Sequence, residues 1–183
     1  NTIRNILLPY LEKRIVTSMI MGFVSGLPLL LTITLLQAWL TDENVSKSTI
    51  GLFALIGLPY SLKFLWAPIF DRYVLSSLGR RRGWLLIIQV FLIIAIFSLG
   101  QSRPEINLFN VALLSLALTF FSASQDILID AFRRESLLEH EQTIGASAYV
   151  LGYRIGALAA GAGGLILADI YSYAFVYTLM SLI

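Results

Sequence analysis

Residues 15–40 read IVTSMIMGFVSGLPLLLTITLLQAWL, a run of 26 residues without a charged side chain. An α-helix rises about 1.5 Å per residue, so about 20 helical residues cross the roughly 30 Å hydrocarbon core of a membrane. The apolar core of a secretory signal peptide is shorter, at about 7–15 residues. This stretch is therefore predicted to be a true membrane span.

Further apolar runs follow along the rest of the chain. We predict spans at residues 15–40, 48–70, 84–102, 106–132 and 143–168, with an incomplete sixth at 170–183. Helices are expected, because only helices and closed barrels satisfy their backbone hydrogen bonds in lipid, and barrel strands would be alternating segments of about ten residues. The predicted fold class is an all-α integral membrane bundle with a truncated sixth helix. Because the chain starts at Asn1 and stops inside an apolar run, we expect a partial N-terminal bundle whose C-terminal half is absent.

The composition excludes a soluble domain and argues against an enzyme. Hydrophobic residues make up 57% of the chain and charged residues 13%, about half the charged share of an ordinary globular domain. The chain has no cysteine and a single histidine, His140, so a disulfide framework and a thiolate zinc site are excluded. No catalytic residue, cofactor or metal is predicted, and the lipid bilayer is the expected surrounding.

The basic residues gather on alternate loops between the predicted spans. If the N-terminus is cytoplasmic, the outer segments carry only Lys47 and Arg103, whereas the inner segments carry nine basic residues: Arg4, Lys13, Arg14, Arg72, Arg80, Arg81, Arg82, Arg133 and Arg134. Such an excess on the cytoplasmic side is the usual orientation signal of membrane proteins. It predicts a cytoplasmic N-terminus, and it explains the basic residues without a nucleic-acid partner.

Four ionisable residues fall inside the predicted spans: Lys63, Asp126, Asp130 and Arg154. Each costs roughly 2.5–3.5 kcal/mol at the centre of a membrane helix on insertion scales. Asp126 and Asp130 share one helix face, and Lys63 and Asp126 are expected at similar depth. We interpret the four as a polar cavity that binds an anionic or sugar-like solute and relays a proton through an aspartate. A static ion-pair network that only holds helices together is the alternative.

Amides and small residues complete the set of candidates. Gln125 and Gln37 are possible site residues, although an amide can also hydrogen-bond a neighbouring helix. The remaining candidates are expected to serve helix packing, through small residues that let backbones approach closely and a proline that kinks its helix: Gly152, Gly156, Gly22, Gly26 and Pro28.

Residues 66–83, WAPIFDRYVLSSLGRRRG, resemble the signature loop of the major facilitator superfamily. Asp71-Arg72 matches its acidic-basic pair, and Gly79-Arg80-Arg81 matches its glycine and basic cluster. Ala67 replaces a glycine of the pattern, and about four extra residues separate the pair from the cluster. The resemblance implies an inner gate in which Asp71 pairs with a basic residue at the base of the fourth helix, where Arg133 is well placed.

A closer resemblance covers roughly residues 20–169. SGLPL and LQAW in the first span, KFLWAPIFDRY, LGRRRGWLL, SASQDILIDAF and VLGYR are similar to the AmpG muropeptide permease family. The resemblance implies the N-terminal six-helix half of a major facilitator superfamily transporter. It further implies proton symport of N-acetylglucosaminyl-anhydro-N-acetylmuramyl peptides across the inner membrane of Gram-negative bacteria, which serves peptidoglycan recycling and beta-lactamase induction.

Two alternatives to this carrier remain open. Acetyl-CoA transporters share a similar Gln-Asp-Ile segment, so a carrier of another anionic solute is possible. A non-transporting fragment of a split or degraded gene would carry the same motifs. The family usually has arginine-glycine after the glutamate that corresponds to Glu141, where this chain has Gln142-Thr143-Ile144-Gly145. This difference affects the expected gate closure rather than the fold.

Overall fold

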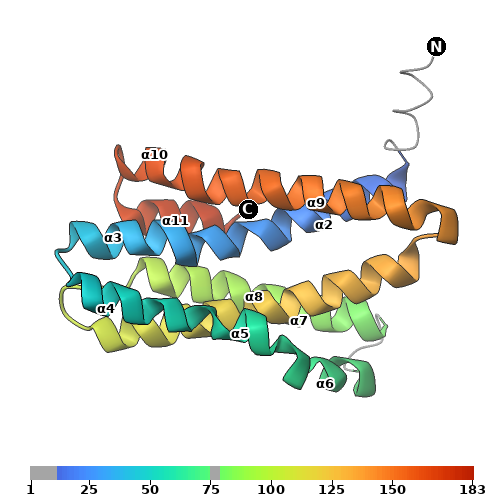
Figure 1. Ribbon diagram of the computed structural model, residues 1–183, viewed down its shortest axis with the longest axis horizontal. Helices are drawn as coiled ribbons and strands as arrows, with labels where there is room; N and C mark the ends of the chain where they lie inside the picture. Colours follow the sequence, from blue (N-terminus) through green and yellow to red (C-terminus); the bar gives the residue numbers. More distant parts are fainter. Residues whose placement is uncertain (1–11, 75–78) are drawn as a thin grey trace, which may run out of the picture.

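The computed structural model describes residues 12–74 and 79–183, and within those ranges the regular structure is entirely helical (Figure 1). The first span consists of α2 (Lys13–Leu30), a π-helical turn (Leu31–Leu35) and α3 (Leu36–Asp42). The third and fourth spans are the single helices α7 (Arg80–Gly100) and α8 (Leu108–Ser136). The fifth consists of α9 (Gln142–Leu158), a π-helical turn (Ala159–Gly163) and α10 (Gly164–Ala168), and α11 (Tyr173–Ser181) follows.

Among residues 12–74 and 79–183, five helical segments are long and apolar enough to cross a membrane: Lys13–Asp42, Lys47–Leu65, Arg81–Gly100, Leu108–Ser136 and Glu139–Ala168. They lie side by side along the long axis of the molecule (Figure 1). The basic residues that bound them gather at one end, which we call the basic end and define by Lys13, Arg14, Arg72, Arg81, Arg82, Arg133 and Arg134. Arg4 lies outside the described residues.

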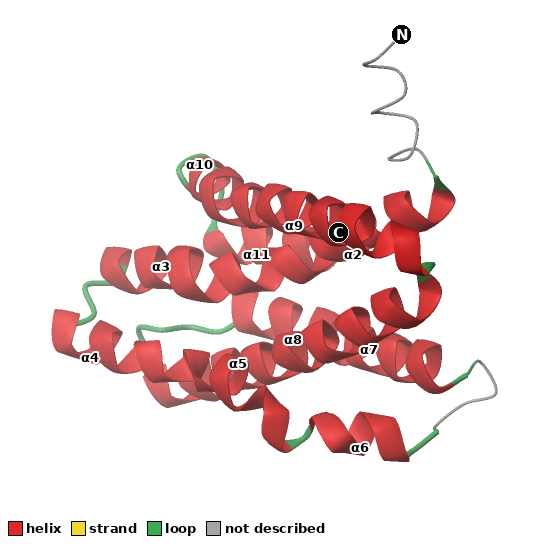
Figure 2. Ribbon diagram, turned by 45° about the vertical axis from the view of Figure 1, so that its right-hand side comes forward, coloured by secondary structure: helices red, strands yellow, loops and turns green. Residues whose placement is uncertain are grey.

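The second span is not the uninterrupted helix that hydropathy predicts. It comprises α4 (Lys47–Leu52), a 3-10 turn (Phe53–Gly57), α5 (Leu58–Leu62), a second 3-10 turn (Lys63–Leu65) and α6 (Ala67–Arg72). Pro59 and Pro68 stand in the first turns of α5 and α6. A proline has no backbone N–H and its ring clashes with the preceding turn, so it begins a helix more easily than it continues one. The segment α6 consequently turns away from the line of α4 and α5 (Figure 2).

Helices α2 and α9 approach each other backbone to backbone. A Cβ atom on any of four glycines would collide with a backbone carbonyl of the other helix: Gly22 with Tyr149, Gly26 with Tyr153, Gly152 with Met19 and Gly156 with Phe23. The four glycines therefore form a reciprocal seam, which we call the glycine seam. It places the first and fifth spans in fixed register.

Pro28 lies within α2 without ending it. The helix widens into the π-helical turn Leu31–Leu35 just after the proline, and the Thr32 hydroxyl donates to the carbonyls of Pro28 (3.3 Å) and Leu29 (3.0 Å). The predicted distortion therefore takes the form of a wide turn, a common way to accommodate a break in the hydrogen-bond ladder.

The largest apolar cluster lies towards the end of the bundle opposite to the basic end. It joins α2 and α3 to α7, α8 and α11 through buried side chains such as Leu31, Leu36, Leu99 and Leu118. Tyr177 of α11 is completely buried, and its hydroxyl donates to the carbonyl of Leu31 at 2.8 Å. This bond anchors the short α11 against the first span.

Candidate functional site

Asp126 is the most buried of the four charged side chains inside the predicted spans. It lies on α8 with 8% of its surface exposed, and it is contacted from two other helical segments. The Ser25 hydroxyl of α2 donates to its Oδ1 atom, and the Lys63 ammonium from the second span lies 3.7 Å from its Oδ2 atom. The predicted similar depth of Lys63 and Asp126 is thus confirmed by their ion pair.

A row of polar side chains along α8 leads to Asp126. Thr119 donates to the carbonyl of Ile56 at 2.8 Å, and Ser122 accepts a hydrogen bond from Tyr60 at 2.8 Å. Positions three and four apart share a helix face, so these residues and Asp126 point towards the second span. The row explains why this segmented span stays attached to α8 although it is otherwise the least buried of the five.

Asp130 belongs to a second charged pair, one turn nearer the basic end. The Arg133 guanidinium lies 3.5 Å from the Asp130 carboxylate, and it also lies over the ring of Tyr149 at 5.5 Å from the centroid. The Arg133 side chain therefore faces α9. Its buried Nε atom has no hydrogen-bond partner among the described residues.

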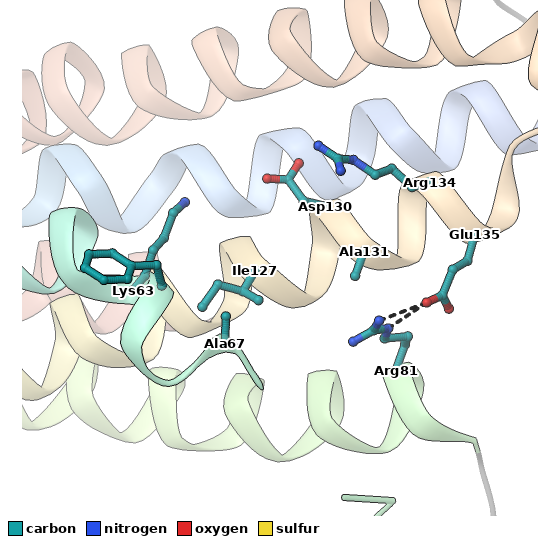
Figure 3. A pocket seen from close by; sticks show the side chains of 9 residues that line it. Lys63, Ala67, Arg81, Ile127, Asp130, Ala131, Arg134 and Glu135 are labelled. Atoms are coloured by element: carbon teal, nitrogen blue, oxygen red, sulfur yellow. Dashed lines mark hydrogen bonds and ion pairs between the residues drawn. The ribbon is translucent and has the colours of Figure 1, made fainter. Parts of the chain in front are cut away.

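A cavity of about 440 Å³ opens between the second span and α8 (Figure 3). Its lining residues are Lys63, Phe64, Ala67, Arg81, Ile127, Asp130, Ala131, Arg134 and Glu135. Lys63 lies at one end of it and the ion pair between Arg81 and Glu135 at the other. Three cations and two carboxylates thus surround a space in which an anion or a hydroxylated solute could bind.

The signature loop is held by Arg81. Its guanidinium lies 2.6 Å from Asp71 and 2.9 Å from Glu135, so it ties the end of α6 to α8. Arg72 lies over the Tyr73 ring. Gly79 precedes α7 with a φ of 98°, which favours glycine. The side chain of Arg80 lies outside the described residues.

The expected gate pair differs from the observed one. The resemblance implies that Asp71 pairs with Arg133, but in the structure Asp71 pairs with Arg81. Arg133 lies on another face of α8 and contacts the ring of Tyr149 on α9.

Arg154 is a correction to the expected cluster of four charges. It is exposed on α9 beside Ser147, Val150 and Leu151, and it makes no ion pair within the described parts of the chain. The reason is helical periodicity. Arg154 is two residues, about 200°, from both Gly152 and Gly156, and these glycines face α2, so Arg154 must point the other way.

Neither of the two amides hydrogen-bonds to Asp126. Gln125 is fully buried and donates to Gln89 of α7, which makes it a link between helices. Gln37 lies on α3, 12 residues along the chain from Ser25 and thus roughly 18 Å further along the span. The structure accordingly brings together Lys63, Asp126 and Asp130 but not Gln125, Gln37 or Arg154.

Sequence reasoning missed two residues next to Asp126, Ser25 and Tyr149. Ser25 is buried, and its hydroxyl lies 3.1 Å from the Tyr149 hydroxyl. Serine and tyrosine are common in membrane helices, so residue type alone marks neither, although Ser25 begins the SGLPL motif. The available signal was position, because Ser25 adjoins Gly26 and Tyr149 lies three residues before Gly152, where the glycine seam brings the two helices together.

Comparison with known proteins shows the family of this chain. The family model described as acetyl-coenzyme A transporter 1 matches residues 15–173. The chain belongs to this family. Curated relatives also confirm the predicted resemblance to AmpG permeases.

The anhydromuropeptide permease of Escherichia coli strain K12 is 48% identical over 158 residues, which are 86% of this chain and 32% of the relative. The putative transporter AmpG 4 of Rickettsia felis is 36% identical over 162 residues, 87% of this chain and 39% of the relative. The putative transporter AmpG 1 of Rickettsia bellii is 34% identical over 166 residues, 88% of this chain and 40% of the relative. The chain therefore spans about a third to two fifths of the length of these relatives.

These matches and the helical bundle confirm the predicted fold class, an all-α membrane protein like the N-terminal half of a major facilitator superfamily transporter. The names of the family and of these relatives denote transporters and permeases rather than enzymes. Among residues 12–74 and 79–183, no group of three or more histidines, cysteines, aspartates and glutamates could hold a metal ion.

Proposed function

We propose that this chain is part of a proton-coupled carrier that imports muropeptides across the cell inner membrane. The observation that carries the proposal is Asp126, a buried carboxylate that contacts α2 and the second span and pairs with Lys63 beside a charged cavity. Identity of 48% to the anhydromuropeptide permease of Escherichia coli supports the class of solute.

The Lys63–Asp126 pair provides a mechanism for coupling. The two opposite charges attract each other, and a carboxylate that gains a proton loses its attraction for the cation. Protonation of Asp126 frees Lys63, which borders the cavity. The freed ammonium can then pair with a carboxylate of the solute. Release of the proton on the opposite side restores the internal pair and displaces the solute.

The cavity suits a muropeptide chemically. An N-acetylglucosaminyl-anhydro-N-acetylmuramyl peptide carries hydroxyls, amides and carboxylates. Carboxylates pair with the cations Lys63, Arg81 and Arg134, and its donor groups reach Asp130 and Glu135. A C-terminal half would close the other side of this site, because carriers of this class rock one half against the other around a midplane site.

The proposed carrier also has an orientation in the membrane and a role in the cell. The basic end, with the N-terminal Lys13 and Arg14, lies in the cytoplasm under the positive-inside rule. An importer in this orientation returns cell-wall fragments to the cytoplasm for peptidoglycan recycling and as signals for beta-lactamase induction.

Acetyl-CoA is the second candidate solute, because the matching family model is described as an acetyl-coenzyme A transporter. The phosphates of this anion would also suit Lys63, Arg81 and Arg134. The preferred experiment produces the protein in a strain that lacks its own muropeptide permease and measures entry of labelled anhydromuropeptide and of labelled acetyl-CoA. Uptake of the muropeptide that a protonophore abolishes is expected. Uptake of acetyl-CoA alone would contradict the proposed solute, and uptake of neither would indicate a non-transporting fragment.

A further inference from the structure

The Asp126 carboxylate is connected to α9 through a single buried hydroxyl. Ser25 of α2 donates to Asp126 and lies 3.1 Å from the hydroxyl of Tyr149. Ser25 is 1% exposed, so bulk water does not compete freely for it. Asp126, Ser25 and Tyr149 therefore form a continuous hydrogen-bonded chain between two spans.

The direction of this chain depends on the charge of Asp126. A hydroxyl has one proton to donate. Because Ser25 uses its proton on the ionised Asp126, it can only accept from Tyr149, and the tyrosine hydroxyl must donate. Once Asp126 is protonated, its own O–H can donate to Ser25, whose proton then turns towards the Tyr149 oxygen. The chain thus has one orientation for each protonation state.

Tyr149 also contacts the neighbouring charged pair. The Arg133 guanidinium lies over the Tyr149 ring, 5.5 Å from its centroid, and Arg133 pairs with Asp130 at 3.5 Å. The backbone of Tyr149 is fixed against Gly22 by the glycine seam. The close approach of α2 and α9 therefore keeps the side chains of Ser25 and Tyr149 within reach of each other.

We propose that Tyr149 is a positioning residue that acts through Ser25 to stabilise the ionised form of Asp126 and links the protonation of Asp126 to the Arg133–Asp130 pair. This inference rests on the proposed function only in the assignment of Asp126 as the proton carrier. The titratable or charged groups near Asp126 are Lys63 of the second span, Tyr60 of α5, Asp130 of α8, and Tyr149 and Tyr153 of α9.

Tyr153 provides a matched control. It lies one turn beyond Tyr149 on the same helix, with ring centroids 6.3 Å apart, and it is also half-buried. Within the described residues its hydroxyl makes no hydrogen bond. Tyr153→Phe therefore removes a hydroxyl from the same neighbourhood without breaking the chain to Asp126.

The test titrates the Asp126 carboxyl directly in the purified protein that contains this chain. Infrared difference spectra recorded against pH follow the carbonyl stretch of protonated carboxyls, and loss of a band in Asp126→Asn assigns it. Tyr149→Phe should move the midpoint of that band to higher pH by about 0.5–1 unit, a roughly three- to ten-fold change in proton affinity, because a hydrogen bond that favours the charged form is lost. Tyr153→Phe should leave the midpoint unchanged.

Ser25→Ala tests the same link from the other helix. It should shift the midpoint in the same direction, and adding Tyr149→Phe to it should produce no further shift, because the chain is already broken. A wild-type midpoint in both single variants, or equal shifts in Tyr149→Phe and Tyr153→Phe, would overturn the inference. The titration needs no transport, so absence of muropeptide uptake by the wild type would refute the proposed function and leave this result standing.

Discussion

Arg81 shows how much of the architecture at the basic end depends on one side chain. It pairs with Asp71 at the end of α6 and with Glu135 near the end of α8, and only 11% of its side chain is exposed. α6 turns away from the line of the second span (Figure 2), and these ion pairs tie it to the bundle together with the buried Phe70 ring, which packs against Trp84.

Replacing Arg81 with alanine should loosen α6. Exposed ion pairs contribute about 0.2–1 kcal/mol each, so amides of α6 are expected to exchange with deuterium up to about five-fold faster for each lost pair. Arg82→Ala is the matched control, since the Arg82 guanidinium lies over the Phe132 ring and forms no ion pair within the described residues. Hydrogen exchange followed by mass spectrometry measures both. Equal exchange of α6 in the two variants would show that Arg81 does not hold this segment.

The residues of the candidate site differ in how visible they are in the sequence. Asp126, Asp130 and Lys63 could be predicted because a charge stands out in an apolar run. Arg154 stood out equally, but its orientation was decided by the neighbouring glycines. Ser25 and Tyr149 carry no charge, and their importance comes from contacts between residues more than a hundred positions apart, so only their position beside the glycine seam points to them.

At the scale of the elements, α2 and α9 are the pair that organises the bundle. Four glycines allow their backbones to touch, and the two π-helical turns that follow them in the first and fifth spans also contact each other. Hydropathy predicts where such spans lie. It does not predict the segmentation of the second span, because Pro59 and Pro68 act locally and leave the mean hydropathy unchanged.

Filling the glycine seam should destabilise the protein. Gly152→Ala places a methyl group against the Met19 carbonyl, and overpacking of this kind costs about 1–3 kcal/mol. Gly163→Ala on the same span is the control, since its nearest neighbour is the Leu158 carbonyl at 4.0 Å. Thermal unfolding in detergent should show a lower midpoint for Gly152→Ala and little change for Gly163→Ala. Similar midpoints for the two would contradict the close approach of α2 and α9.

At the scale of the whole molecule, the charge distribution distinguishes the two ends of the bundle. Most Lys and Arg residues bound one end, whereas Lys47 and Arg103 are the basic residues of the opposite loops. The sequence predicts this asymmetry completely, because it depends only on which loops alternate. The proposed cytoplasmic location of the basic end rests on this asymmetry.

Cysteine labelling tests that orientation cleanly, because the chain has no native cysteine. Ser48 is exposed at the end opposite to the basic end, and Glu139 is exposed at the basic end, so each can be replaced by cysteine in turn. A membrane-impermeant maleimide added to intact cells is expected to label Ser48→Cys at once and Glu139→Cys only after lysis. The reverse pattern would place the basic end outside.

In the proposed mechanism Asp126 carries the proton that drives uptake, and a proton-flux recording measures this proton. Proteoliposomes with the protein that contains this chain are suspended in weak buffer, and anhydromuropeptide is added while the external pH is followed. The wild type and Asp169→Asn, which changes an exposed carboxylate far from the site, should both make the medium more alkaline as protons enter with the solute. Asp126→Asn should produce no change in external pH. A wild-type pH response in Asp126→Asn would show that another group carries the proton.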